Sequence, residues 1–251
     1  MAEEHKFPSE MIDLPSEGRL YPKEHPLSSG KLELKYMTTK EEDILMSQNL
    51  IKKGVVIDKL LDSLIVTKGI TQDDLILGDK NAVLVAARIL AYGPEYTCKV
   101  NNPNNPEEII EHTFDLTKCP FKEALDDVDY SGNSFDYETP IGKTKLKFRL
   151  LTGKEERLIE KDLKQGSKFG YESSISTRLR YMITEVDGET KEEVITVFAQ
   201  NMLARDSVAF RKYVADISPD IELEQEIEIG GDTVSASIPL TVEFFWPSSI
   251  E

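Results

Sequence analysis

KLELKYMTTKEE at residues 31–42 decides the fold, because the pattern returns as KLKFRLLTGKEE at residues 145–156. Lys, Leu, Thr, Lys, Glu and Glu are identical in register, and most other pairs exchange similar side chains, such as Leu34 for Phe148. Recurrence in a fixed order indicates a duplicated supersecondary unit. Two long copies are too few for a solenoid, so we expect a body of two pseudo-repeated halves.

Each copy begins with an alternating apolar pattern that predicts a strand. Thr38 with Glu41, and Thr152 with Glu155, then form capping boxes that start helices. Each helical stretch is followed by a step of proline and an acidic residue, and then by an alternating hairpin pattern. The predicted fold class is therefore α+β, with two pseudo-repeated halves, each a strand, a capped helical segment and a closing β-hairpin.

The helices of the two halves differ in their expected extent. The first capped helix should run to about Lys53 and end at Gly54. Asp79 can cap a later helix, which stops before Gly93. The second half carries an insertion with an extra helix at 191–204. We expect partner specificity to lie where the copies differ, in this insertion and in the unequal hairpins.

The chain divides into four segments along the sequence. A lead-in rich in Pro, Ser and Gly predicts an extended arm, because proline fixes φ and removes a hydrogen-bond donor. The polar, turn-rich stretch between the two copies predicts a linker. The segments are the N-terminal arm at 1–30, the first repeat unit at 31–125, the linker at 126–142, and the second repeat unit with helical insertion and C-terminal hairpin at 143–251.

The bulk composition suits a soluble globular protein, with 39% hydrophobic and 30% charged residues. No apolar run approaches the ~18–20 residues of a membrane span. The acidic and polar N-terminus does not resemble a signal peptide. Cys98 and Cys119 are too few for a secreted disulfide scaffold. We therefore predict a cytoplasmic protein without a membrane partner.

The net charge is −16, which disfavours nucleic-acid binding because neutralising phosphates requires clustered Lys and Arg. Three interpretations of this charge stay open. An acidic surface keeps a protein soluble, it meets a partner that has a basic patch, or it mimics a nucleic acid.

The residues that carry chemistry in enzymes form no recognisable pattern. Zinc needs clustered Cys, His or carboxylate ligands, and the cysteines and histidines here are scattered. The alternating glutamates of 222–228 are typical of a solvated strand face that deters edge pairing. The sequence contains no GxSxG elbow, Walker loop or GxGxxG turn. We predict no catalytic residue, cofactor, metal or small-molecule substrate, and a protein that acts through its surfaces.

Two apolar segments are candidate partner-binding surfaces. The apolar residues of the extended arm must be buried either against the body or on another chain. Aromatic residues near a chain end, which would normally fray, either tie the tail into the body or anchor an interface. The candidates are Leu14, Pro15, Leu20 and Tyr21 in the arm, and Phe244, Phe245 and Trp246 near the C-terminus.

Several segments together resemble the baseplate hub assembly proteins of T-even-like contractile-tailed bacteriophages. They are LPSEGRLYP at 14–22, MTTKEEDIL at 37–45, the stretch from Asp79 through Arg88 to Gly93, and FFWP at 244–247. The resemblance covers nearly the whole chain. It implies a late phage protein that helps to build the baseplate hub, as a chaperone-like factor or as a hub component. Other phage hub or tail proteins are the implied partners, and the host cytoplasm and the virion tail are the implied locations.

Many members of that family have CxxC pairs in both hairpins, like small zinc ribbons. This chain retains only Cys98 in its first hairpin, with Cys119 beyond it, and has no cysteine in the second. We therefore predict that apolar packing replaces zinc. Two other functions stay open: a tail-associated hydrolase, which would need a cleft with a carboxylate of raised pKa, and an acidic protein that sequesters a basic partner.

Overall fold

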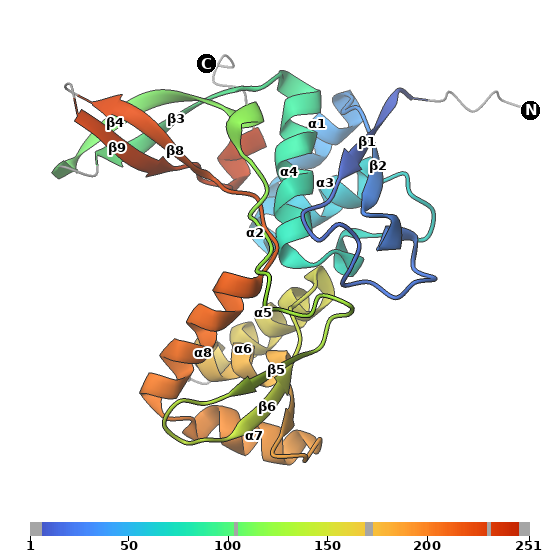
Figure 1. Ribbon diagram of the computed structural model, residues 1–251. Helices are drawn as coiled ribbons and strands as arrows, with labels where there is room; N and C mark the ends of the chain where they lie inside the picture. The colour runs from blue at the N-terminus through green and yellow to red at the C-terminus, as the bar shows by residue number, and fades with distance from the viewer. Residues whose placement is uncertain (1–6, 103–104, 169–172, 230–231, 246–251) are drawn as a thin grey trace, which may run out of the picture.

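The computed structural model describes residues 7–102, 105–168, 173–229 and 232–245. In these ranges eight α-helices combine with small antiparallel sheets, which confirms the predicted α+β class. Figure 1 shows two lobes joined by a narrow crossing of extended segments. In that view, the helices of the first half lie in the upper lobe and those of the second half in the lower lobe.

The upper lobe begins with a two-stranded sheet whose first strand lies within the N-terminal arm. Leu32 and Leu34 alternate toward the core, as expected for a strand with one buried face. Strand β1 (Ser9–Asp13) pairs antiparallel with β2 (Lys31–Lys35). Four helices follow: α1 (Thr39–Leu45), α2 (Gln48–Lys53), α3 (Val56–Leu64) and α4 (Leu77–Tyr92).

Two helix predictions for this lobe are wrong in detail. The first capped helix does not continue to Lys53, because Ser47 adopts an extended conformation (φ −70°, ψ 101°) and starts α2 separately. Gly54 does end α2, in the left-handed conformation with φ of 72°. Asp79 does not cap α4: Ile76 is the N-cap residue, and Asp79 lies inside the first turn.

The lower lobe packs four helices against a three-stranded antiparallel sheet in the order β5-β6-β7. Phe148 on the central strand stacks on Phe135 and meets Phe210 edge-on, with ring centroids 5.5 and 5.0 Å away. The strands are β5 (Phe135–Glu138), β6 (Lys145–Phe148) and β7 (Ile183–Val186). The helices are α5 (Gly153–Lys168), α6 (Ser174–Met182), α7 (Glu192–Asn201) and α8 (Ala204–Ile217).

Two hairpins lie together at one side of the upper lobe (Figure 1). The first consists of β3 (Glu95–Asn102) and β4 (Asn105–Asp115), the second of β8 (Glu224–Ile229) and β9 (Asp232–Ser237). The side-chain amide of Gln225 donates to the carbonyl of Asp115 at 2.8 Å, which joins them. The buried residues of the hairpins include Tyr96, Phe114, Ile227 and Ala236. The predicted second repeat unit, 143–251, therefore contributes to both lobes. Its helices belong to the lower lobe, whereas its hairpin lies beside the first hairpin in the upper lobe.

The repeated sequence has the same local structure in both lobes. The backbone amide of Thr38 donates to Glu41 Oε2 at 3.0 Å, and that of Thr152 donates to Glu155 Oε2 at 3.0 Å. A basic residue of the preceding strand region adds an ion pair in each copy, Lys35 to Glu41 at 2.9 Å and Arg149 to Glu155 at 3.4 Å. These shared contacts agree with a duplication, which stays a prediction.

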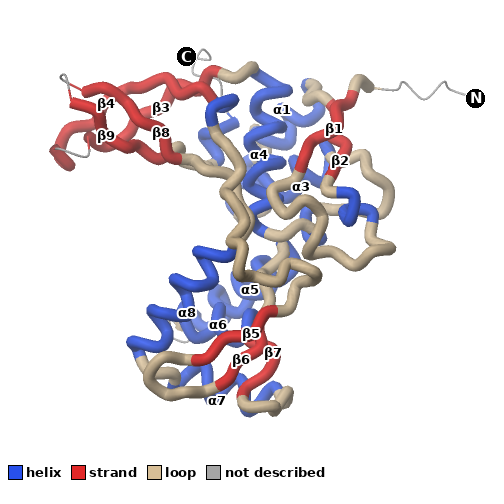
Figure 2. Tube along the Cα trace, viewed as in Figure 1, coloured by secondary structure: helices blue, strands red, loops and turns tan. Residues whose placement is uncertain are grey.

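Two isolated β-bridges pair extended segments where the two lobes meet. Ile76 forms an antiparallel bridge with Thr152, and Phe121 forms another with Ile221. The amide of Gly153 donates to the carbonyl of Leu75 at 2.9 Å, close to the first bridge. Figure 2 shows that the crossing segments are loops, outside helices and strands. The relative position of the lobes therefore depends on main-chain pairing between residues far apart in sequence.

Candidate docking surfaces

The N-terminal arm is anchored to the upper lobe by a buried carboxylate. Asp79 accepts hydrogen bonds from the amide of Ser16 at 2.9 Å, the hydroxyl of Ser16 at 2.7 Å and the hydroxyl of Tyr21 at 2.7 Å. The Tyr21 hydroxyl in turn accepts from the amide of Ile76 at 3.0 Å. The arm is therefore folded against α4, with Leu14, Pro15, Leu20 and Tyr21 all buried.

The ionisation of this cluster follows from its burial. Burial raises the pKa of Asp79, and the hydrogen bonds from Tyr21 and Ser16 offset only part of that effect. Burial and the neighbouring Asp79 both raise the pKa of Tyr21. The Tyr21 hydroxyl therefore stays protonated and is the donor of its hydrogen bond to Asp79.

The aromatic residues near the C-terminus also pack inside the upper lobe. Phe244 and Phe245 are buried, and the Phe244 ring meets Tyr96 edge-on at 4.8 Å between centroids. Arg88 Nε donates to the carbonyl of Phe244 at 3.0 Å and holds this segment against α4. Trp246 lies outside the described residues. Six of the seven candidate partner-binding residues are thus buried within the chain, and its docking surfaces must be sought elsewhere.

The cysteines lie near the paired hairpins and do not form a metal cluster. Cys98 on β3 is half-buried, and Cys119 is buried and accepts from the Gln225 side-chain amide at 3.3 Å. Burial raises the pKa of both thiols. Among the described residues, no group of three or more His, Cys, Asp or Glu side chains is placed to hold a metal ion.

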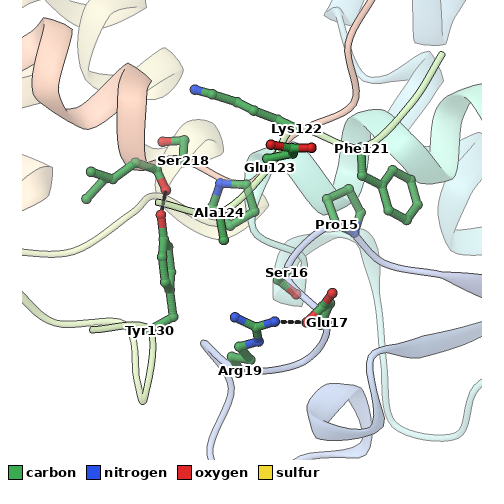
Figure 3. Close-up of a pocket in the computed structure, with 12 residues that line it drawn as sticks. Pro15, Ser16, Glu17, Arg19, Phe121, Lys122, Glu123, Ala124, Tyr130 and Ser218 are labelled. Carbon is green, nitrogen blue, oxygen red and sulfur yellow. Dashed lines mark hydrogen bonds and ion pairs between the residues drawn. The ribbon is translucent and has the colours of Figure 1, made fainter. Parts of the chain in front are cut away.

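A hollow of about 320 Å³ lies between the N-terminal arm and the crossing segments around Phe121 and Pro219. Figure 3 shows two contacts within the chain at this hollow: Arg19 pairs with Glu17, and Tyr130 donates to the carbonyl of Ile217 at 3.0 Å. Its wall also includes Ala124, the partly exposed ring of Phe121 and the polar residues Ser16, Lys122, Glu123 and Ser218. The hollow lies at the lobe junction and has a mixed polar and apolar lining.

A longer groove runs along the lower lobe between α6 and α8. It consists of two adjoining hollows of about 570 and 210 Å³, which share Arg178, Met182 and Arg211. The larger hollow extends to the lobe junction, where Ile76, Gly78 and Asn81 of the upper lobe line it together with Lys122 and Asp220, and the smaller one ends at Ile175. We call this depression the α6–α8 groove.

Four of the exposed large apolar side chains of the described residues belong to the inserted helix, the residues after it and the first half of the next helix. Val194 and Val197 lie one turn apart on α7, Leu203 follows that helix, and Val208 lies in α8. Val197, Leu203 and Val208 expose 59%, 52% and 58% of their surface, so the rest of the chain does not cover them. We call these four residues the α7–α8 apolar surface. The sequence pointed to this insertion as a place for partner specificity but not to these side chains.

Comparison with protein-family models, curated proteins and solved structures found no match to this chain. Among the described residues, no helix has the length and apolar character needed to cross a membrane.

Proposed function

We propose that this protein is a non-catalytic docking factor that assembles the hub of a phage tail baseplate. The proposal rests on the ordered resemblance of four sequence segments to the hub assembly family. Its docking component rests on one structural observation, the α7–α8 apolar surface. The position of these exposed side chains, in and beside the predicted insertion, supports a docking role for this part of the chain.

The chemistry of this surface favours a partner that presents apolar side chains beside basic ones. Burying apolar area stabilises a complex by roughly 25 cal/mol per Å². Glu192 and Glu193 lie in the first turn of α7 next to Val194. In a chain with net charge −16, these carboxylates add attraction for basic groups and speed their association. A tail hub protein with a mixed apolar and basic face fits these requirements.

Co-expression with individual tail hub proteins, followed by size-exclusion chromatography, tests the proposal. We expect one hub protein to co-elute with the wild-type chain and to separate from a Val197→Ser, Val208→Ser variant. Val66→Ser is the matched control, since Val66 is also an exposed valine, 45% accessible, but lies in the upper lobe. If none of the hub proteins co-elutes with the wild type, the proposed function is wrong.

The proposal places the protein in the host cytoplasm during assembly. A chaperone-like factor leaves before the tail is complete, whereas a hub component remains in the virion baseplate. Mass spectrometry of purified virions distinguishes these two roles, because only a component is present in a fixed ratio to the other hub proteins.

A further inference from the structure

We propose that the α6–α8 groove binds an apolar peptide segment of a partner protein that carries an acidic side chain. This site differs from the α7–α8 apolar surface, and the inference does not depend on the phage assignment. The groove lies between two helices, which is where amphipathic segments commonly dock on helical proteins. Three features support the assignment: the apolar floor, the charge at its centre and the opposite charge at one end.

The floor of the groove is apolar and already formed. Leu179 and Met182 of α6 are buried beneath it, and Leu150 and Leu151 form the buried wall of the larger hollow. Ile175 lines the far end of the smaller hollow and is half exposed, at 50%. Apolar side chains of a bound peptide would displace water from this preformed channel and from the exposed isoleucine at its end. Burial of that apolar surface would stabilise the complex.

The centre of the groove is basic, although the chain as a whole is strongly acidic. Arg178 and Arg211 line both hollows. Arg178 is held in place by two hydrogen bonds to Glu156, so its charge is largely compensated. Arg211 forms no ion pair in the described part of the chain, and its Nε bonds the carbonyl of Ser207 at 3.3 Å. The terminal nitrogens of Arg211 are therefore free to take a carboxylate in a two-point contact.

The junction end of the groove has the opposite charge and sets the orientation of the occupant. Asp220 and Glu222 line this end, where the side-chain amide of Asn81 donates to Asp220 at 3.1 Å. Lys122 lies at the same end, where its amide donates to the carbonyl of Asp220 at 2.8 Å, and its charge offsets one of the two carboxylates. A carboxylate is attracted to Arg211 and repelled by Glu222. The segment should therefore place its acidic side chain toward Arg211 of α8 and its apolar side chains toward Leu150.

Selection from a displayed library of random short peptides, with the full chain as bait, tests this inference. We expect enriched sequences that combine apolar residues with one Asp or Glu. A synthetic peptide of the winning sequence should bind Arg211→Glu about tenfold more weakly than the wild type, the effect of losing a charge-assisted contact. Ile175→Ser should also weaken binding, through the apolar end of the groove.

Matched controls separate the groove from general charge and general hydrophobicity. Lys212→Glu makes the same charge change on the adjacent exposed residue, which lines neither hollow, and should leave the affinity unchanged. Val194→Ser is the control for Ile175→Ser, because Val194 is exposed on another helix. Equal losses in Lys212→Glu and Arg211→Glu, enrichment of basic peptides, or no enrichment at all would overturn the inference. So would a dimer of the wild-type chain that Arg211→Glu abolishes, since a second copy would then occupy the groove.

Discussion

Gly78 lies directly against the backbone of Pro219: a Cβ atom at position 78 would be 1.7 Å from the Pro219 carbonyl oxygen. These residues belong to the first turn of α4 in the upper lobe and to the segment that returns from α8 in the lower lobe. Gly153 makes a similar approach, with a Cβ that would lie 2.3 Å from the carbonyl oxygen of Gln72. The two lobes therefore meet through main chain, at positions where a side chain does not fit.

Gly78→Ala should destabilise the protein by about 1–3 kcal/mol, because the added methyl group must push the crossing segments apart. Urea unfolding measures this loss. Gly132→Ala is the control, since a Cβ there meets nothing within 4 Å, and its unfolding free energy should stay close to that of the wild type. A Gly78→Ala protein as stable as this control would show that the close approach does not hold the lobes together.

Tyr21→Phe should release the arm. The change removes the hydroxyl that donates to Asp79 and accepts from the amide of Ile76, and leaves both buried partners short of one bond. We expect a loss of about 1–3 kcal/mol, together with faster proteolysis within the arm. Tyr36→Phe, which removes an exposed hydroxyl bonded to Glu10, should have little effect. Unchanged proteolysis of Tyr21→Phe would contradict the anchoring role of Asp79.

Glu41 should make the upper lobe sensitive to acid. Burial alone would raise the pKa of this side chain, but hydrogen bonds from Lys35, Ser63 and Thr38 outweigh it and lower the pKa to about 2. Because the folded value lies below the ordinary one of 4.5, the stabilisation is complete above about pH 4.5 and is lost as the pH falls toward 2. The difference corresponds to roughly 3 kcal/mol of stability.

Unfolding of Glu41→Gln as a function of pH checks this expectation. The variant should be less stable than the wild type at neutral pH, and the difference should shrink between about pH 4.5 and 2. Glu24→Gln is the control, because Glu24 is exposed and its loss removes no buried contact. Parallel pH profiles of Glu41→Gln and the wild type would rule out the coupling of Glu41 ionisation to folding.

Both cysteines should react slowly with a thiol reagent in the folded protein. The thiolate is the reactive form, and burial raises the pKa of Cys98 and of Cys119. We expect Cys119 to be the slower of the two, since it is buried, whereas Cys98 is half-buried. Cys98→Ser and Cys119→Ser variants assign the two rates, and the urea-unfolded chain provides the reference. Folded rates equal to that reference would mean that the paired hairpins open freely.

Much of the local structure could be predicted because its contacts span few residues. Thr38 and Glu41 are three positions apart, so the capping box was readable before any tertiary contact was known. The sequence does not predict the break between α1 and α2, because a serine inside a helical pattern does not show whether it starts a new helix. Asp79 was assigned to a local cap, whereas its carboxylate binds the arm through residues more than fifty positions away.

The candidate surfaces were harder to predict, since exposure depends on which apolar residues the rest of the chain covers. The patterns of the apolar arm and the aromatic C-terminal segment favour the core over an interface without deciding between them, and the structure places Leu20 and Phe244 in the core. Arg178 and Arg211 are far apart in sequence, and only the packing of α6 beside α8 brings them to one groove. Nothing in the local pattern around either residue indicates that they meet.

By itself, the sequence determined the α+β class, the two strand-to-helix starts and the hairpins, because these depend on periodicity and on hydrogen bonds between near neighbours. The tertiary structure alone decided that the second hairpin lies beside the first, that the arm is seated on Asp79 and that a basic groove opens between α6 and α8. Those arrangements rest on contacts such as Gln225 to Asp115, whose partners are joined only when the whole chain is folded. Contacts of this kind produce no periodic pattern in the sequence, so they cannot be predicted from it.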